Sequence, residues 1–182
     1  MRITVVGRGR VGGGLARLWT DAGHTVTALG RDGGDATGAD AVLVAVPGRA
    51  IAEALGRVSG LSGRTTIDAT NIYRERDGSF PSLSHQIKSI VGGPTAKSFS
   101  TVFATTYERI PAQRVGPSAL FACDPEARGI TEQLIRDAGL DPVLIGDLDP
   151  GARLLEDSSG LTRAIAAHMG PFFTRYAPPG EL

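Results

Sequence analysis

Residues 3–12 have the sequence ITVVGRGRVG, and this stretch indicates the fold of the chain. Its first four residues are β-branched, which is typical of a buried strand. Gly7, Gly9 and Gly12 then form a G-x-G-x-x-G pattern, and residues 11–21 carry apolar side chains at helical spacing. A strand that ends on this glycine pattern and continues into a helix predicts a dinucleotide-binding turn.

Each glycine of the pattern has a separate expected role. Gly7 allows the tight turn, Gly9 lets backbone amides approach a pyrophosphate, and Gly12 lets the helix pack closely on the strand. The first turn of that helix carries a partial positive charge, which attracts phosphates. The alternative is an ordinary glycine-rich turn between a strand and a helix.

The end of the second predicted strand, residues 25–29, indicates which dinucleotide binds. In NAD-binding proteins a carboxylate roughly 20 residues beyond the glycine pattern holds the ribose 2′-hydroxyl. Here Asp32 is the first carboxylate after the predicted strand, and Arg31 stands directly before it. The guanidinium of Arg31 suits a 2′-phosphate. Arg8 offers a second cation, so NADP(H) is favoured. Two alternatives remain: solvated surface arginines, or Asp32 facing the ribose.

Strand-like and helix-like segments alternate along the rest of the chain. We expect strands at 25–29, 41–46, 65–69, 95–99, 119–123 and 143–145, and helices at 50–58, 82–91, 124–138 and 151–169. Asp124 is expected to cap its helix, with Pro125 in the first helical position. Residues 31–40 are too few for a crossover helix and predict a turn or a stunted helix, and residues 71–81 predict a loop.

This order predicts a Rossmann-like, doubly wound α/β fold with a mostly parallel sheet, in a single domain with a C-terminal helix. Residues 1–150 would form the NADP-binding Rossmann domain. Residues 151–182 would form a C-terminal helix and tail that pack on this domain or on a dimer partner. The length of 182 residues agrees, because one domain takes roughly 100–200 residues.

Composition excludes several classes of function. Lys and Arg number 19 and Asp and Glu number 19, so the basic excess typical of nucleic-acid binding is missing. The longest apolar run, 41–46, is far shorter than the roughly 20 residues of a membrane span. The N-terminus has no signal-peptide pattern, and the single cysteine, Cys123, cannot form an internal disulfide. We therefore expect a cytoplasmic protein with no membrane or nucleic-acid partner.

Other chemistry has weak support in the sequence. The histidines His24, His85 and His168 are scattered without metal-ligand spacing, so no metal site is expected. His24 is expected to help close the turn before the second strand. His85 is either a surface residue or a residue near the substrate, and Cys123 is more typical of a core residue than of a nucleophile.

Longer motifs occur along most of the chain. They are GRGRVGG at 7–13, AGH at 22–24, GR at 30–31, AVP at 45–47, IDATN at 67–71, KSFSTVF at 97–103 and ARLLE at 152–156. In this order they resemble the NADP oxidoreductases dependent on coenzyme F420, also called NADPH-dependent F420 reductases. The resemblance implies hydride transfer between NADP(H) and the deazaflavin F420, on a Rossmann domain that is usually a homodimer.

The resemblance also implies roles for individual residues. The pyrophosphate would be held by Gly7, Gly9, Arg10, Val11 and Gly12, the 2′-phosphate by Gly30 and Arg31, and the path to the nicotinamide would be lined by Val46 and Pro47. The nicotinamide end would lie near Thr70 and Asn71, and the acceptor near Ser100, Thr101 and Val102.

Three positions depart from the family pattern. Gly30 stands where serine is usual, which is expected to remove one hydrogen bond to the 2′-phosphate. Ser100 stands where asparagine is common, and Asp157 where proline is common. These departures affect the expected acceptor, F420 or a flavin, more than the expected cofactor.

Hydride transfer between two rings needs few catalytic side chains, because the protein mainly orients the rings and excludes water. The absence of a catalytic triad therefore neither supports nor opposes an NADP-dependent oxidoreductase. Two alternatives remain open: a non-catalytic NADP(H)-binding or sensing module, and a reductase of a small carbonyl or imine compound.

Overall fold

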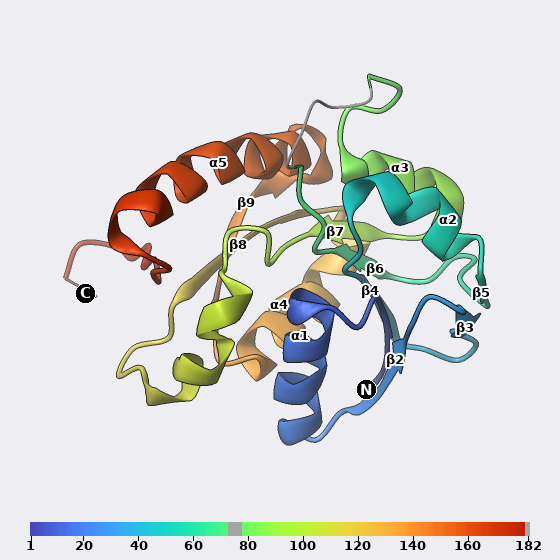
Figure 1. The fold of residues 1–182 in the computed structure, drawn as a ribbon, viewed down its shortest axis with the longest axis horizontal. Helices are drawn as coiled ribbons and strands as arrows, with labels where there is room; N and C mark the ends of the chain where they lie inside the picture. The colour runs from blue at the N-terminus through green and yellow to red at the C-terminus, as the bar shows by residue number, and fades with distance from the viewer. Residues whose placement is uncertain (73–77, 181–182) are drawn as a thin grey trace.

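The computed structural model describes residues 1–72 and 78–180, which form a seven-stranded sheet covered by helices on both faces (Figure 1). The strands of this sheet are β1 (Arg2–Val6), β2 (Thr25–Leu29), β4 (Ala41–Val44), β6 (Thr66–Asp68), β7 (Thr95–Lys97), β8 (Ser118–Cys123) and β9 (Asp141–Asp147). The α-helices are α1 (Arg10–Asp21), α2 (Ile51–Leu55), α3 (Leu83–Val91), α4 (Arg128–Asp137) and α5 (Leu148–Met169). The 3-10 helices are η1 (Gly48–Ala50), η2 (Ala104–Ala112) and η3 (Pro125–Ala127). The predicted Rossmann-like α/β fold is confirmed.

The strand order is β2-β1-β4-β6-β7-β8-β9. Neighbours from β2 to β7 pair in parallel, β8 runs antiparallel to β7, and β9 runs parallel to β8. The sheet is therefore mostly parallel, as predicted. From β1 the chain first adds β2 on one side and then β4 on the other, and ligands of such sheets bind at this reversal, outside the carboxyl ends of the strands.

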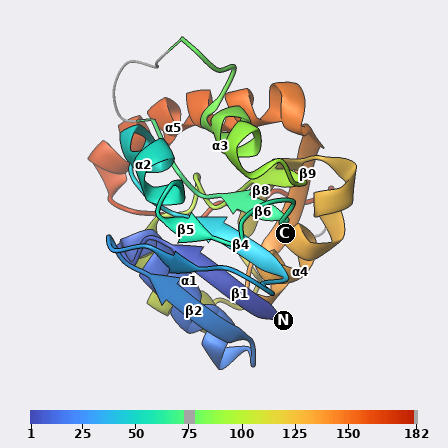
Figure 2. The ribbon, with the colours of Figure 1, turned by 90° about the vertical axis from the view of Figure 1, so that its right-hand side faces the viewer.

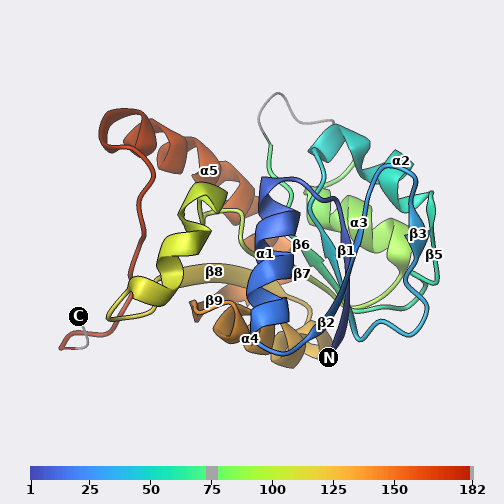
Figure 3. The same cartoon turned by 60° about the horizontal axis from the view of Figure 1, so that its bottom comes forward.

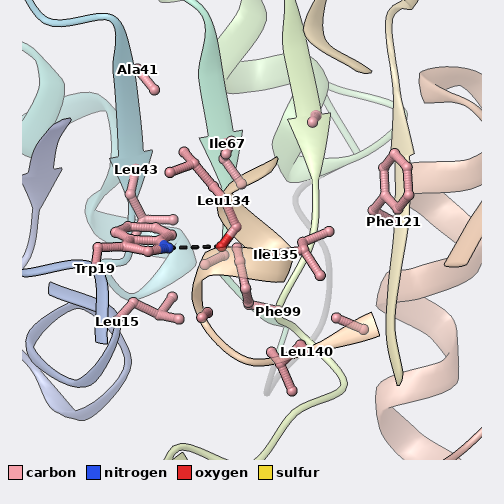
Figure 4. Close-up of a cluster of buried hydrophobic side chains, with 14 of the residues drawn as sticks. Leu15, Trp19, Ala41, Leu43, Ile67, Phe99, Phe121, Leu134, Ile135 and Leu140 are labelled. Atoms are coloured by element: carbon pink, nitrogen blue, oxygen red, sulfur yellow. Dashed lines mark hydrogen bonds between the residues drawn. The ribbon is translucent and has the colours of Figure 1, made fainter. Parts of the chain in front are cut away.

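Helices α1 and α4 cover one face of the sheet, and α2, α3 and α5 cover the other (Figures 2 and 3). Successive side chains of a strand point to opposite faces of the sheet, so each strand contributes to both cores. Leu43 belongs to the core under α1 and α4, whereas its neighbour Val42 belongs to the core under α2 and α3. Trp19 is the largest fully buried side chain of the first core (Figure 4). Its Nε1 donates to the carbonyl oxygen of Leu134 at 2.8 Å, and its ring meets that of Phe99 edge-on at 5.9 Å.

The expected turn at 31–40 is confirmed, at residues 31–32 and 37–38, but a short strand lies between the two turns where a stunted helix was the alternative. A short strand, β3 (Gly34–Asp35), pairs in parallel with β5 (Val58–Ser59) and forms a separate two-stranded sheet. The Asp35 carboxylate accepts hydrogen bonds from the Ser59 hydroxyl at 2.6 Å and from Thr37. These hydrogen bonds lower the pKa of Asp35, because they favour its charged form. The partner strand lies more than 20 positions away, so local composition could not indicate the pairing.

The predicted helices at 50–58 and 82–91 exist, but the first is short. It consists of η1 and α2, and it ends before Gly56, a residue that disfavours helix continuation. The second is α3, capped by the Ser82 hydroxyl, which accepts from the backbone N–H of His85 at 3.3 Å. The predicted loop at 71–81 lies partly outside the described residues.

Asp124 is the N-cap residue of the helix after β8, as predicted, but its side chain makes no capping hydrogen bond. Pro125 occupies the first helical position as expected, and η3 leads into α4. The Asp124 carboxylate instead accepts from the backbone N–H of Thr95 at 2.8 Å and from Lys88 Nζ at 2.7 Å. The antiparallel pairing of β7 with β8 brings the end of β8 beside the start of β7, so the Asp124 carboxylate reaches the Thr95 N–H and Lys88.

Helix α5 packs against β7, β8 and β9. Asp149 has non-helical backbone angles, so regular helical geometry begins after it. Gly151 makes the close approach possible, because a Cβ atom there would lie 2.5 Å from the Ala122 Cβ of β8. No helix in the described part of the chain is both long enough and apolar enough to cross a membrane.

Replacement of Trp19 by phenylalanine should lower the free energy of unfolding by about 2–4 kcal/mol. The change leaves the Leu134 carbonyl without its buried donor and opens space in the core. Urea denaturation followed by circular dichroism measures the loss. Arg17→Ala on the same helix, where the side chain is 68% exposed, should cost less than about 0.5 kcal/mol. Equal losses in the two variants would contradict the assigned role of Trp19.

Candidate functional site

The turn between β1 and α1 depends on two glycines that lie against backbone. Gly7 has a φ of +109°, and a Cβ atom there would lie 2.4 Å from the Ala45 carbonyl oxygen at the end of β4. A Cβ atom at Gly12 would lie 1.9 Å from the carbonyl oxygen of Gly7. No side chain fits at either place, so the helix begins directly at the carboxyl end of β1.

Gly9 is different, because nothing lies within 4 Å of the position where its Cβ atom would be. It is the N-cap residue of α1, and no side chain caps the helix. The first turn of α1 contains no acidic residue, and the first amides of a helix have no partner within it. Open space, free N–H donors and the positive end of the helix therefore meet at Gly9, an arrangement that suits a diphosphate.

At the end of β2 the chain turns between Gly30 and Gly33, whose backbone N–H donates to the Gly30 carbonyl at 3.3 Å. Arg31 and Asp32 occupy the tip of this turn and are exposed. The Arg8 guanidinium lies against Gly30, since a Cβ atom built there would be 2.4 Å from Arg8 Nη2. A serine at position 30 would require the flexible end of the Arg8 side chain to move.

Arg57, which no sequence pattern indicated, also reaches this turn. Its Nη1 donates to the Arg31 carbonyl at 2.8 Å, and its Nη2 pairs with Glu53 Oε1 at 2.8 Å. Arg57 thus holds the backbone of the turn from the segment after α2. No spacing in the sequence points to this contact, because the two residues meet only when β5 packs beside β3.

A cavity of about 350 Å3 lies at the carboxyl edge of the parallel strands. Its described lining comes from the start of α1, the segments after β6 and β7, the start of η2, and α5. The residues are Arg10, Val11, Ala69, Asn71, Phe99, Ser100, Thr101, Val102, Phe103, Ala104, Thr105, Ser159, Thr162 and Arg163. The structure thus brings the predicted Arg10, Val11, Asn71 and residues 100–102 together, and adds α5, which the sequence analysis did not connect with the site.

Polar groups in this cavity are held in defined positions. Asn71 Nδ2 donates to the Ser100 carbonyl at 3.0 Å, and its Oδ1 accepts from the backbone N–H of Ile72 at 3.0 Å. The amide of Asn71 therefore joins the segments after β6 and β7. The Ser100 hydroxyl oxygen is buried and has no hydrogen-bond partner within the described residues.

Phe99 is the one non-glycine residue in the described ranges with a positive φ, at +62°. This left-handed conformation is costly for a bulky residue. The ring packs on Trp19 in the core and keeps Phe99 in place, so the chain turns sharply at the cavity wall directly before Ser100.

A buried ionic cluster supports the same segments from behind. Lys97 Nζ lies 2.9 Å from Asp68 Oδ2 and 3.7 Å from Glu156 Oε1, and all three side chains are fully buried. Asp68 also accepts from the Ser84 hydroxyl at 2.6 Å and from Thr70, through its backbone N–H at 2.7 Å and its hydroxyl at 2.6 Å. Asp68 and Lys97 are register partners on neighbouring strands, so sheet pairing places them together.

The cluster ties three elements to the sheet. Lys97 Nζ donates to the Thr70 carbonyl at 2.7 Å, which fixes the segment that leads to Asn71. Glu156 on α5 accepts from the backbone N–H of Leu83 at 2.7 Å and so serves the first turn of α3. The motifs around 67–71, 97–103 and 152–156 thus meet at this cluster, although the sequence assigned no role to Lys97 or Glu156.

Some predicted site residues lie outside the cavity lining. The Thr70 hydroxyl is engaged by Asp68, and His85 Nδ1 is hydrogen-bonded to the Ser82 hydroxyl at 2.7 Å in the first turn of α3. Val46 contacts the glycine turn rather than the cavity, since its Cγ1 would lie 3.0 Å from a Cβ atom at Gly7. Pro47 follows it and is exposed.

The remaining titratable residues have structural surroundings. His24 Nε2 lies 2.9 Å from Asp137 Oδ2, and its Nδ1 lies 3.2 Å from the N-terminal amine, so it joins the start of β2 to α4 and to Met1. Burial raises the pKa of Cys123 to about 11, which leaves little nucleophilic thiolate near neutral pH. Within residues 1–72 and 78–180 no group of His, Cys, Asp and Glu could hold a metal ion.

Structural comparison places this fold among Rossmann-type proteins. A proposed F420-dependent NADP reductase from Arthrobacter sp. FB24 matches with a TM-score of 0.76 and 21% identity, over 97% of this chain and 99% of that one. A hypothetical protein from Sinorhizobium meliloti matches with a TM-score of 0.69 and 23% identity, over 84% and 88%. A reductive aminase from Aspergillus terreus, in complex with NADPH and ethyl levulinate, matches with a TM-score of 0.62 and 18% identity, over 93% and 62%.

No protein-family model and no curated protein matches the sequence. At the identities found, the likeness to solved structures is a likeness of fold. It agrees with the family resemblance of the sequence motifs, because the similarity to the Arthrobacter protein extends over nearly the whole of both chains.

Replacement of Lys97 by methionine should lower the free energy of unfolding by about 3–5 kcal/mol, because it removes the cation that pairs with the fully buried Asp68 carboxylate at 2.9 Å. The matched control is Lys88→Met, which removes a lysine that is 44% exposed and pairs with Asp124 at 2.7 Å. That change should cost at most about 1 kcal/mol. Chemical denaturation measures both, and a loss at Lys97 no larger than that at Lys88 would contradict the structural role of the cluster.

Proposed function

We propose that this protein is an NADP(H)-dependent oxidoreductase that transfers a hydride between NADP(H) and the deazaflavin F420 or a flavin-like acceptor. One observation carries the proposal. The open, uncapped start of α1 at Gly9 lies between the arginine-bearing turn after β2 and the cavity at the carboxyl edge of the sheet. A dinucleotide needs these three parts in this order, for its adenosine phosphate, its diphosphate and its nicotinamide.

The residues present fit the cofactor. The free amides at the start of α1 would donate to the diphosphate, where a Cβ atom at Gly9 would meet open space. Arg31 at the tip of the turn after β2, with the Arg8 guanidinium against Gly30, would hold the 2′-phosphate. A guanidinium pairs with phosphate through two charged hydrogen bonds. No carboxylate lies on β2 itself to receive a ribose 2′-hydroxyl.

The cavity supplies what hydride transfer needs from the protein. When bound, NADP(H) supplies or accepts the hydride. Phe99, Val102 and Phe103 would give the cavity apolar walls that exclude water, and Asn71 joins the two segments that form its polar side. No side chain of this chain has to form a covalent intermediate.

A second candidate is reduction of a small carbonyl or imine compound. It is supported by the fold shared with the Aspergillus terreus reductive aminase in complex with NADPH and ethyl levulinate. The cavity volume of about 350 Å3 suits a small substrate as well as a ring. The third possibility, an NADP(H)-binding module without catalysis, shares the cofactor site but predicts no turnover.

The proposal is tested by mixing the protein with NADPH and F420, FMN, or cyclohexanone with an amine, and following the absorbance of NADPH. We expect oxidation with F420 or FMN. Gly9→Glu is the matched control, because its Cβ atom meets nothing within 4 Å while its carboxylate repels the diphosphate. This variant should keep its stability within about 0.5 kcal/mol and bind neither NADPH nor NADH measurably. Oxidation with the ketone and amine alone would favour the second candidate, and binding without any oxidation the third.

Replacement of Arg31 by alanine should weaken NADPH binding by about 1–3 kcal/mol and leave NADH binding nearly unchanged, because only NADPH carries the 2′-phosphate. Fluorescence titration measures both affinities. Arg8→Ala should act in the same direction, and Arg2→Ala, at the opposite end of β1, should change neither affinity. Equal losses for NADPH and NADH on replacing Arg31 would show that it does not read the 2′-phosphate.

A further inference from the structure

We propose that Arg57 sets the preference of this protein for NADP(H) over NAD(H), although it lies outside the turn that would bind the 2′-phosphate. Arg57 holds this turn so that Arg31, and not Asp32, faces the ribose of the adenosine. The inference rests on the proposed function, since it concerns the cofactor of the same site. Arg57 is a positioning residue in this role, because it acts through the backbone of Arg31.

The turn after β2 presents two side chains with opposite preferences. Arg31 and Asp32 are neighbours at its tip, and both are exposed. A guanidinium here binds a 2′-phosphate, whereas a carboxylate binds a ribose 2′-hydroxyl and repels a phosphate. The same turn therefore carries a group for either dinucleotide, and the orientation of its tip decides which of them is used.

The far end of the turn is held by the backbone of Arg57. Gly33 has a φ of +77°, and a Cβ atom there would lie 1.9 Å from the Arg57 carbonyl oxygen. The backbone N–H of Gly34 donates to the same oxygen at 3.1 Å, where β3 begins to pair with β5 (Figure 1). This contact does not involve the side chain at position 57, so a substitution there leaves the end of the turn attached.

The tip of the turn is held by the side chain of Arg57. Its Nη1 donates to the Arg31 carbonyl oxygen at 2.8 Å, and this oxygen belongs to the peptide that joins Arg31 to Asp32. Because a peptide is planar, a short turn redirects its side chains by rotation about the backbone bonds on either side of it. Rotation there breaks the bond to Arg57, so the bond favours one orientation of the tip.

A second contact orients the Arg57 guanidinium itself. Its Nη2 lies 2.8 Å from Glu53 Oε1, four positions earlier on α2. Two bonds from different nitrogens of a planar guanidinium fix its orientation as well as its position. The two side chains are 51% and 68% exposed, and ion pairs at such exposure add little stability. The consequence of the pair is therefore the placement of the guanidinium.

Glu53 separates positioning from simple attraction between charges. A cation near the turn attracts a phosphate through space, whether or not it holds the backbone. Removal of the Glu53 carboxylate makes the surroundings of the turn more positive, which strengthens NADPH binding if Arg57 acts by charge alone. The same removal releases the Arg57 guanidinium, which weakens NADPH binding if Arg57 acts by positioning. The two explanations thus predict effects of opposite sign.

The inference is tested by fluorescence titration of each variant with NADPH and with NADH. Arg57→Met should weaken NADPH binding at least about fivefold and change NADH affinity less than about twofold. Glu53→Ala should weaken NADPH binding about threefold, again with little change for NADH. A change in folding would weaken the binding of both cofactors, so the ratio of the two affinities reports on the turn.

Asp32→Asn shows which side chain faces the ribose. In the otherwise unmodified protein it should leave NADH affinity unchanged, because Asp32 points away. In the Arg57→Met background the tip is released and Asp32 reaches the ribose, so the same substitution should weaken NADH binding about threefold. An equal effect of Asp32→Asn in the two backgrounds would contradict the choice between Arg31 and Asp32.

Arg136→Met is the matched control. Arg136 also pairs with a glutamate four positions earlier, Glu132 at 3.1 Å, and is 58% exposed, but it lies on α4. Its replacement should change neither affinity.

An unchanged preference for NADPH in Arg57→Met would overturn the inference, and so would equal weakening of NADPH and NADH. Tighter NADPH binding by Glu53→Ala would show that Arg57 acts by charge, which overturns it as well. An unmodified protein that binds NADH as tightly as NADPH would refute both the inference and the NADP(H) specificity of the proposed function. A protein that prefers NADPH through Arg57 but oxidises it with no acceptor would refute the proposed oxidoreductase and leave the inference in place.

Discussion

The contact between Gly12 and the carbonyl oxygen of Gly7 is the constraint on which the rest of the structure depends. Backbone meets backbone there so closely that a Cβ atom would lie 1.9 Å from that oxygen. As a result α1 starts directly at the carboxyl end of β1, with its free amides facing open space at Gly9. The same placement carries Trp19 across the sheet face to the Leu134 carbonyl. The helix α1 therefore belongs both to the glycine turn and to the hydrophobic core.

The walls of the cavity are stabilised by charge inside the protein. Buried ion pairs contribute little net stability unless their remaining hydrogen-bonding groups are satisfied. Around Lys97 the Asp68 carboxylate is satisfied, because it accepts from Ser84 and Thr70, and Glu156 Oε1 accepts from the backbone N–H of Leu83 in α3. The cluster joins three elements that are not adjacent in the sequence: the segment after β6, α3 and α5. The cluster therefore holds the segment before Asn71 and the first turn of α3 in fixed positions beside the cavity.

The departure from the family pattern at Gly30 has a structural counterpart at Arg8. The Arg8 guanidinium lies against Gly30, where the family resemblance implied a serine hydroxyl. A charged donor binds phosphate more strongly than a neutral hydroxyl does. In the proposed 2′-phosphate site, the Arg8 guanidinium would supply a charged donor in place of the serine hydroxyl.

The sequence by itself determined the fold class, the glycine turn and most strands, because these follow from backbone conformation and from side-chain periodicity over a few residues. The Gly30–Arg31 turn was found in the same way, from its distance to the glycine pattern. Only the tertiary structure decided that Arg163 and Phe99 line the cavity, that Lys97 meets Glu156, and that the Asp124 side chain turns to Thr95 instead of making a capping hydrogen bond. These contacts join residues that are far apart in the chain, and their partners are chosen by sheet register and helix packing, which no local pattern encodes.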